Sequence, residues 1–384
     1  MDETRELFRA LELAHYAERF RERLFVIALP AEAAFSQLVM DFKVLASYRI
    51  QVLLVTRDPD FGLQEAISRA NKRGSRFQLS LLTELLLSPQ DDALLVDFER
   101  VRTSLAQGYT PVIAYHGSNF PDSPQAAEPQ DVERIFSLAA RVALEMEARK
   151  LLLVTPVAEA LRGALPRSSV QMSELEGLPE RLREAGLESA LPLCRFVSEQ
   201  LTRGLPDVVL LEARSGHLFR EVFTYDGAGI LFTPTRSARV RRGELRDVTD
   251  ISLLLRPEVE AGNILPVPES HIEANIHNYW VYEIDGMPVG QACIKRHGDD
   301  AEMAQFATLP RYRGRGRARE LAQFLVDEAR RQGCGRVFAL SIDPRMWEFF
   351  QSLGFEPVER EVLPLEWRRN YDLSRPSRAF LKDL

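Results

Sequence analysis

A loop of alternating arginine and glycine constrains the fold of this chain more than any other stretch. Residues 313–318 read Arg-Gly-Arg-Gly-Arg-Ala and follow a strand candidate, Glu302–Leu309. A helical pattern comes next, with apolar residues at Leu321, Phe324, Leu325 and Ala329. Two glycines end the pattern, and Arg336–Ile342 reads as a second strand. This order of strand, loop, helix and strand indicates an α/β unit built around the loop.

The loop has the chemistry of an anion site. A helix N-terminus leaves its first N–H groups without intrahelical acceptors and carries partial positive charge. Glycines allow the backbone to approach an anion closely, and arginines can reach a phosphate with forked donors. A glycine loop alone is a weak signal, because an ordinary basic turn has the same composition. The strands and the helix around it favour a phosphate-binding loop.

The same residues resemble the GNAT acetyltransferases, whose fold binds acetyl-CoA. Arg313, Gly316 and Ala318 match the loop pattern of that family, and Trp347–Val358 matches the end of its core. The resemblance implies that the pyrophosphate of acetyl-CoA lies on the amides of Arg313, Gly314, Arg315, Gly316, Arg317 and Ala318. It also implies that pantetheine lies along Phe306, Ala307 and Thr308 like an added strand.

Composition narrows the class of protein. The 384 residues predict two domains or three, and 45% hydrophobic residues are enough for real cores. A net charge of −7 argues against a nucleic-acid-binding protein, and the basic stretch Thr233–Gly243 lacks the aromatic residues that stack on bases. The charged N-terminus does not resemble a signal peptide, and no apolar run approaches membrane-spanning length. We therefore expect a cytoplasmic protein without nucleic-acid or membrane partners.

Cysteine and histidine spacing predicts no metal site. Cys194, Cys293 and Cys334 are an odd, sparse set that suits a reducing compartment. The histidines at 116, 217, 271, 277 and 297 are scattered without ligand spacing.

The first 232 residues predict a mostly parallel sheet covered on both faces, because buried apolar strands alternate with helices. The expected strands are Leu24–Leu29, Ile50–Thr56, Tyr109–Tyr115, Leu151–Thr155 and Val208–Glu212. The expected helices are Asp2–Arg23, Ala31–Leu45, Leu63–Asn71, Ser80–Leu87, Ala93–Ala106, Asp131–Arg149, part of Met172–Glu184, and Leu193–Arg203. A polar loop is expected over Pro121–Pro129.

This half resembles the three-layer α/β fold of amino-acid kinases in a degenerate form. The first strand leads into Leu29-Pro30-Ala31-Glu32-Ala33, where the family has a glycine phosphate loop. Thr155-Pro156-Val157 lacks the family's acid, and Arg195 stands where a lysine is expected. Without these groups phosphoryl transfer loses its main stabilising contacts. We expect residues 1–234 to form a non-catalytic domain for regulation and assembly.

The second half predicts a linker over residues 235–243 and a GNAT α+β domain over residues 244–384. Its helices are expected in Glu244–Ala261, with Asp247 as a possible cap, and in His271–Asn278. Tyr279–Ile284 and Pro288–Lys295 read as a hairpin joined by an Asp-Gly turn. Phe219–Pro234, with its Asp-Gly-Ala-Gly turn, resembles the junction between the two domains of N-acetylglutamate synthases.

That domain order resembles the N-acetylglutamate synthases of arginine biosynthesis. It implies acetyl transfer to the α-amino group of an amino acid, most simply L-glutamate, with arginine as a possible effector and a homo-oligomeric assembly. Two other hypotheses stay open. One keeps the acetyl transfer and changes the acceptor to another amino acid or small amine. The other is a non-catalytic sensor of acetyl-CoA or of an amino acid.

Two residues are candidates for the transfer chemistry. Glu302 opens a strand in which Glu302, Ala304, Phe306 and Thr308 alternate to one face, and it would remove the ammonium proton through a water. A solvated glutamate at a strand start is an equally good interpretation. Ser341 would hydrogen-bond the leaving sulfur, although a serine satisfied by backbone is the commoner case. Phe350 stands where many GNAT enzymes have an acidic tyrosine.

Three residues are candidates for binding the acceptor. Arg375 and Ser377 match family residues that hold the carboxylate of the amino acid, and a forked arginine suits that group. A tail arginine paired with surface acids is the alternative. The stretch Gly262–Pro268 lacks the arginine that the family carries there, and Lys295 or Arg296 would replace that charge.

Overall fold

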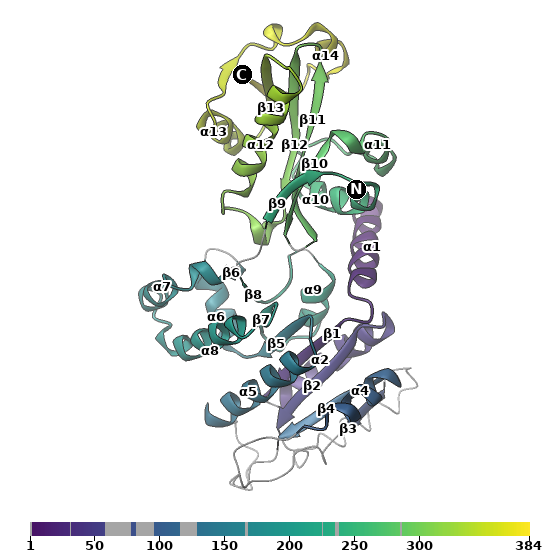
Figure 1. Cartoon of the computed structure of the whole chain (residues 1–384), viewed down its shortest axis with the longest axis vertical. Helices are drawn as coiled ribbons and strands as arrows, with labels where there is room; N and C mark the ends of the chain where they lie inside the picture. The colour runs from purple at the N-terminus through teal and green to yellow at the C-terminus, as the bar shows by residue number, and fades with distance from the viewer. Residues whose placement is uncertain are drawn as a thin grey trace. The chain divides into compact units, whose positions relative to one another are not determined.

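The computed structural model describes residues 2–30, 32–57, 78–81, 96–115, 129–165, 168–224, 226–234, 238–284 and 286–384 (Figure 1). Contacts divide the chain into two compact units. One unit holds residues 12–235, and the other holds residues 236–384 together with residues 1–11.

The N-terminal unit is built on one twisted sheet, in which every described pairing is parallel except that of β7 with β8. The strand order is β3 (Gln78–Leu81), β4 (Tyr109–Tyr115), β2 (Gln51–Arg57), β1 (Leu24–Leu29), β5 (Lys150–Val154), β7 (Val208–Leu211), β8 (Ile230–Thr233) and β6 (Ser169–Gln171). The expected mostly parallel sheet is confirmed.

Side chains of the central strand β1 alternate between two separate hydrophobic cores. Val26 and Ala28 join the core beneath α4 (Phe98–Ala106), α5 (Pro129–Glu145), α6 (Val157–Ala164), α7 (Leu178–Glu184) and α8 (Leu191–Thr202). Phe25, Ile27 and Leu29 join the core beneath α1 (Asp2–Arg19), α2 (Glu32–Ser47) and α9 (His217–Phe223). Because neighbouring residues of a strand point to opposite faces, the unit has three layers, as expected for the amino-acid kinase fold (Figure 1).

The structure corrects one expected helix of this unit and adds elements that pattern reading missed. Gln78–Leu81 is strand β3, so the expected helix Ser80–Leu87 is wrong at its start. The remainder of that stretch, the expected helix Leu63–Asn71 and residues 116–128 lie outside the described residues. The short elements α6, β6 and α9 were not predicted, because segments of three to eight residues carry too little periodicity.

The C-terminal unit is built on a mixed sheet. Its strand order is β14 (Glu356–Val358), β15 (Arg378–Asp383), β13 (Arg336–Ser341), β12 (Asp300–Thr308), β11 (Met287–His297), β10 (Tyr279–Ile284) and β9 (Ala238–Arg242). The pairing of β12 with β13 is parallel, and the other described pairings are antiparallel. The expected hairpin of β10 and β11 is present. The expected linker is shorter than residues 235–243, because Ala238–Arg242 form the edge strand β9.

Helices cover both faces of this sheet. Ala379 and Phe380 are neighbours on β15 and therefore point to opposite faces. Ala379 packs with Trp367 of α14 (Leu365–Asn370), whereas Phe380 contacts Phe350 of α13 (Pro344–Ser352). The longest helix of the unit, α12 (Arg317–Arg331), packs its Phe324 on Trp280 of β10. The remaining helices are α10 (Val248–Glu260) and α11 (Glu269–Ala274).

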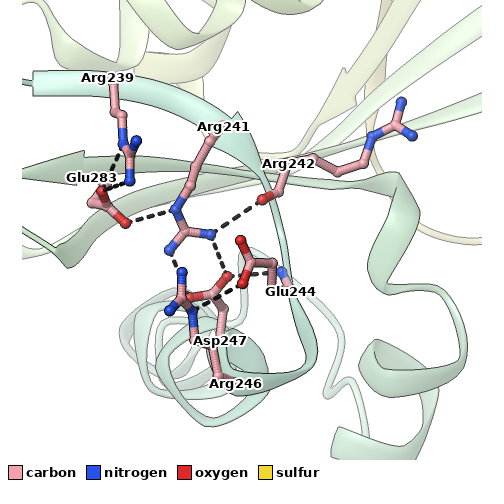
Figure 2. A network of polar contacts seen from close by, with 7 residues as sticks. All are labelled: Arg239, Arg241, Arg242, Glu244, Arg246, Asp247 and Glu283. Carbon is pink, nitrogen blue, oxygen red and sulfur yellow. Dashed lines mark hydrogen bonds and ion pairs between the residues drawn. The ribbon is translucent and has the colours of Figure 1, made fainter.

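A buried ion network attaches β9 to β10 and to the start of α10 (Figure 2). The Arg241 guanidinium donates to both carboxylate oxygens of Asp247, at 2.5 and 2.9 Å, and to Glu283 at 2.6 Å. Asp247 also accepts the N–H of Glu244, so it closes the turn before α10 and makes no side-chain cap of α10 itself. The expected capping role of Asp247 is thus replaced by an ion-pair role.

The network shifts the pKa values of its members. Burial raises the pKa of Asp247, but the hydrogen bonds from Arg241 and from the Glu244 N–H outweigh it, so the pKa is lowered overall. Burial likewise raises the pKa of Glu283, and Arg241 and Arg239 reverse the effect. The hydrogen bond to Asp247 raises the pKa of Arg241 further above its ordinary value.

Replacing Arg241 with methionine keeps the aliphatic bulk and leaves the two carboxylates without their shared cation. We expect the C-terminal unit to lose about 3–5 kcal/mol of unfolding free energy, the usual cost of removing one partner from a buried ion pair. Denaturant unfolding followed by tryptophan fluorescence measures this, because all three tryptophans, Trp280, Trp347 and Trp367, lie in this unit.

Arg239→Met is the matched control, because Arg239 shares Glu283 but is 67% exposed. We expect it to cost less than about 1 kcal/mol. The pKa values of Asp247 and Glu283 are lower in the folded chain than in the unfolded chain. Their ionised forms therefore stabilise the fold at any pH above the unfolded-state pKa, and this stabilisation is lost as the pH falls through the folded-state pKa. The difference in unfolding free energy between wild type and Arg241→Met should therefore become smaller below about pH 4. An unchanged difference at about pH 3 would contradict this assignment.

Candidate functional site

The site lies where two neighbouring strands separate. β12 and β13 pair only from Asp300 to Met303 and from Arg336 to Ala339. Beyond these residues, Ala304–Thr308 on one strand and Leu340 and Ser341 on the other line a cavity of about 390 Å³. An unpaired strand edge presents N–H and C=O groups to whatever enters, so an extended ligand with amide groups can add to β12 as a strand does.

A β-bulge in β12 marks the point of separation. Gln305 has a φ of 58°, in the left-handed region, and the register to β11 shifts between Gln291 and Cys293. Glu302 and Ala304 pair with Lys295 and Cys293, and therefore share a face with them. Thr308 pairs with Gly290 and so points to the opposite face. The expected alternation of Glu302, Ala304, Phe306 and Thr308 to one face is wrong, because the extra residue reverses it.

Buried polar side chains hold the bulge. The Tyr279 hydroxyl donates to Gln305 Oε1 at 2.9 Å, and the Gln291 side-chain amide donates to the Gln305 carbonyl. Gln291 is fully buried. A non-glycine residue in the left-handed region costs about 1–2 kcal/mol, so these bonds stabilise a conformation that Gln305 would not adopt alone.

The arginines of the loop hold its shape. Arg313 donates to the Thr308 carbonyl at 3.0 Å and to Glu258 of α10 at 2.9 Å. Arg317 is buried and donates to the Tyr312 carbonyl at 2.7 Å, with its guanidinium 5.3 Å from the Tyr312 ring centre. Gly316 has a φ of 74° and starts α12. These two guanidiniums therefore hold the loop at the start of α12 in place, and a contact of the loop arginines with phosphates stays a prediction.

Most of the predicted cofactor residues line this one cavity. The lining includes Phe306, Ala307, Thr308, Arg313, Gly314, Gly316, Arg317, Ala318 and Ser341. Arg315 does not belong to it. Phe350 lines the cavity and is packed among Phe306, Phe355 and Phe380, so an aromatic ring without a hydroxyl stands at this position.

Glu302 lies next to the cavity lining, among polar partners. Its carboxylate accepts a hydrogen bond from Trp367 Nε1 at 3.1 Å, and it lies 3.5 Å from His297 Nε2 and 4.0 Å from Lys295 Nζ. Burial raises the pKa of Glu302, but His297, Lys295 and Trp367 outweigh it and lower the pKa overall. Glu302 is therefore ionised at neutral pH. Lys295, predicted to bind the acceptor, faces this carboxylate.

The tail residues reach the same region. Arg375 donates to the Asn263 carbonyl at 3.4 Å, and Asn263 lines the cavity. The Ser377 hydroxyl lies 2.9 Å from the Tyr371 hydroxyl, and the Tyr371 ring stacks on Trp367 at 4.4 Å. Because Trp367 binds Glu302, the tail and the candidate base belong to one connected cluster.

Two further candidates have defined surroundings. Ser341 Oγ accepts the Asp343 N–H at 3.0 Å, which leaves its own proton able to donate toward the cavity. The Arg296 guanidinium donates to the carbonyls of Gly298 and Gln332. The cation in contact with the stretch Gly262–Pro268 is Arg375.

Several site residues escaped sequence analysis. Glu258 accepts from both Arg313 and Asn263, yet in sequence it is one charged residue on a helix with an apolar side. Gln305 gives no local signal, because glutamine is not favoured in the left-handed region. Trp367 and Tyr371 are four residues apart, and this helical spacing was the one available hint.

Among the described residues, no three or more His, Cys, Asp or Glu side chains are arranged to hold a metal ion. Within the same described part of the chain, no helix is long and apolar enough to cross a membrane.

Comparison with known proteins gives the C-terminal unit a family likeness. Residues 250–355 match the acetyltransferase (GNAT) family. The chain is 29% identical over 264 residues to the amino-acid acetyltransferase of Aeromonas salmonicida (strain A449), covering 64% of this chain and 57% of that relative. It is 30% identical over 252 residues to the amino-acid acetyltransferase of Pseudomonas fluorescens (strain Pf0-1), with the same coverage of both chains. The chain thus spans little more than half the length of these curated relatives.

A solved structure matches the order of both units. The N-acetylglutamate synthase of Neisseria gonorrhoeae, in complex with coenzyme A and L-arginine, superposes with a TM-score of 0.57. The two sequences are 21% identical, and the match covers 97% of this chain and 98% of that one. The expected fold, an amino-acid kinase-like unit followed by a GNAT unit, is confirmed.

Gly316→Glu tests whether the loop amides hold the cofactor implied by this fold. The new carboxylate would stand where a pyrophosphate approaches the start of α12. We expect coenzyme A to bind at least roughly 30-fold more weakly, because about 2 kcal/mol of like-charge repulsion corresponds to that factor. Titration calorimetry on the full chain measures the affinity.

Gly333→Glu is the matched control for backbone strain. Gly333 has a φ of 76°, close to the 74° of Gly316, and a Cβ meets no atom within 4 Å at either position. It lies at the opposite end of α12, after Arg331. If both variants lose the same affinity for coenzyme A, strain rather than charge at the loop is responsible and the assignment is wrong.

Proposed function

We propose that this chain transfers the acetyl group of acetyl-CoA to the α-amino group of an amino acid, with L-glutamate as the first acceptor to test. One observation carries the proposal. A single cavity is lined both by the open edge of β12 and by the glycine loop at the start of α12. The open edge of β12 can pair with the amides of pantetheine, and the glycine loop can bind a pyrophosphate. The likeness to amino-acid acetyltransferases supports the same choice.

The proposed transfer uses Glu302 and Ser341 at opposite ends of one proton path. The acceptor ammonium loses a proton through water to Glu302, and the free amine attacks the thioester carbonyl. The C–S bond then breaks, the nitrogen loses its second proton, and the CoA thiolate takes up that proton through water. Ser341 lines the cavity and has its own proton available to stabilise the thiolate as a hydrogen-bond donor. Phe350 offers no proton at the position where a phenol would serve.

For the acceptor, we propose that Arg375 and Ser377 hold the α-carboxylate. Arg375 is the cation that contacts the Gly262–Pro268 stretch, whose own residues carry no positive charge. Lys295 lies beside Glu302 and, in this proposal, contributes positive potential on the same face. A forked guanidinium is the natural partner for a carboxylate.

We propose that the N-terminal unit regulates and assembles the enzyme in the cytoplasm without phosphoryl transfer. β5 ends at Val154, and Thr155-Pro156-Val157 leads directly into α6, with no carboxylate in this turn. The matched Neisseria synthase was solved with L-arginine, which supports arginine as the effector to test first. Homo-oligomeric assembly is part of the same proposal.

Arg375→Ala tests the acceptor site. Losing one arm of a buried charged pair costs about 2–5 kcal/mol, so we expect the acceptor KM to rise roughly 30-fold or more. Affinity for acetyl-CoA should stay nearly unchanged, since Arg375 does not line the cavity. Steady-state kinetics across a panel of amino acids measures both. Arg369→Ala, which removes an exposed arginine of α14, is the control.

An unchanged glutamate KM in Arg375→Ala would show that the tail does not bind the acceptor. If no free amino acid is acetylated by the wild-type chain while acetyl-CoA still binds, the sensor hypothesis replaces the enzyme.

ATP tests the role of the N-terminal unit. We expect no binding of ATP by calorimetry and no phosphorylation of N-acetylglutamate, because the glycine loop, the acid and the lysine of the kinase family are missing. The same preparation should acetylate its amino acid, which shows that the protein is folded. Detectable phosphoryl transfer would overturn the non-catalytic assignment.

A further inference from the structure

One arginine outside the cavity holds the tail that carries the proposed acceptor residues. Arg360 lies in a short turn, Arg360–Val362, between β14 and α14. Its guanidinium donates to three backbone carbonyls of the tail, those of Leu373 at 2.9 Å, Arg375 at 2.8 Å and Ser377 at 3.0 Å. Each of the three guanidinium nitrogens, Nε, Nη1 and Nη2, donates to a different one of these carbonyls.

The tail needs such a partner because it has no regular structure of its own. Residues 371–377 form neither helix nor strand between α14 and β15. Asp372 closes a local turn by accepting the N–H and the hydroxyl of Ser374. No other described residue outside the tail donates to the carbonyls of 373, 375 and 377. Arg360 therefore sets the path of the chain through the two residues that flank Pro376.

Two of the carbonyls that Arg360 binds belong to Arg375 and Ser377, the residues whose side chains are proposed to bind the acceptor. At Arg375, the carbonyl binds Arg360 while the guanidinium reaches the Asn263 carbonyl, at the lining of the cavity. At Ser377, the carbonyl binds Arg360 while the hydroxyl meets the Tyr371 hydroxyl. A displacement of this backbone by one ångström would move both groups together.

We propose that Arg360 is a positioning residue for the acceptor amino acid. It fixes the backbone of Arg375 and Ser377 so that their side chains meet the acceptor carboxylate, and it does not touch the acceptor itself. The inference rests on the proposed function, because it takes Arg375 as the carboxylate-binding group. The guanidinium is required for its shape, since a planar fork can serve three carbonyls and an ammonium on a flexible stem cannot hold the same fork geometry.

Arg360→Ala and Arg360→Lys test the proposal by separating the two substrates. We expect the alanine variant to raise the acceptor KM by about 10-fold or more, since it removes three charge-assisted hydrogen bonds to the backbone of residues 371–377. The lysine variant should fall between wild type and alanine. Affinity for acetyl-CoA, measured by calorimetry, should change by less than about twofold, because Arg360 does not line the cavity.

Arg368→Ala is the matched control. Arg368 of α14 also donates to a backbone carbonyl, that of Leu363, but this carbonyl lies outside residues 371–377. We expect its acceptor KM to stay within about twofold of wild type. An equal rise in Arg360→Ala and Arg368→Ala would overturn a specific role for Arg360. Equal losses of acceptor and acetyl-CoA affinity in Arg360→Ala would also overturn it, since they indicate a general loss of fold.

The double variant Arg360→Ala with Arg375→Ala decides whether Arg360 acts through Arg375. We expect it to show little further rise in acceptor KM beyond Arg375→Ala alone, because there is no guanidinium left to position. Fully additive effects would overturn the inference while leaving Arg375 as a binding residue. If Arg375→Ala alone leaves the acceptor KM unchanged, the proposed acceptor site fails first, and this inference fails with it.

Discussion

The separation of β12 from β13 is the constraint on which the rest of the C-terminal unit depends. Parallel pairing stops at Met303 and Ala339, and one extra residue at Gln305 bends β12 away. The left-handed conformation at the bulge costs free energy in a non-glycine residue. Hydrogen bonds from Tyr279 on β10 and Gln291 on β11 offset this cost. The opening of the cavity therefore depends on buried hydrogen bonds from the next two strands of the sheet, β11 and β10. Removing those bonds would favour a flat, fully paired sheet in which the open strand edge disappears.

The arginines described around the site act mainly by binding backbone carbonyls. Arg313 and Arg317 bind carbonyls and Glu258, and so they fix the loop that lines the cavity. Arg360 does the same for the tail, through three carbonyls. In both places the guanidinium fork replaces the regular hydrogen bonding that an irregular segment lacks. In the proposed function, an anionic ligand would meet the loop amides and the Arg375 guanidinium, both held in place before it binds.

Sequence patterns predicted the elements that are long or strongly periodic. Apolar periodicity and turn residues predicted β1, β2, β4, β5 and β7 of the N-terminal sheet, the hairpin of β10 and β11, and the loop with α12. What escaped prediction depends on contacts between distant residues. Glu302 and Thr308 point to opposite faces because of a bulge that no local residue signals. β9 was predicted to belong to a linker because its sequence is polar and basic, whereas in the structure it pairs with β10 and its Arg241 binds Asp247 and Glu283.

The surroundings of Glu302 limit what it can do in the proposed transfer. Its pKa is lowered, so it is ionised when an acceptor arrives, but it is a weak base toward an ammonium group. Lys295 and His297 stabilise the carboxylate and would oppose a proton that stayed on it. These contacts fit a carboxylate that holds a proton only briefly. In the proposed transfer, Glu302 takes the proton through a water and releases it to solvent, and the hydrogen bond from Trp367 holds the carboxylate in place for this step.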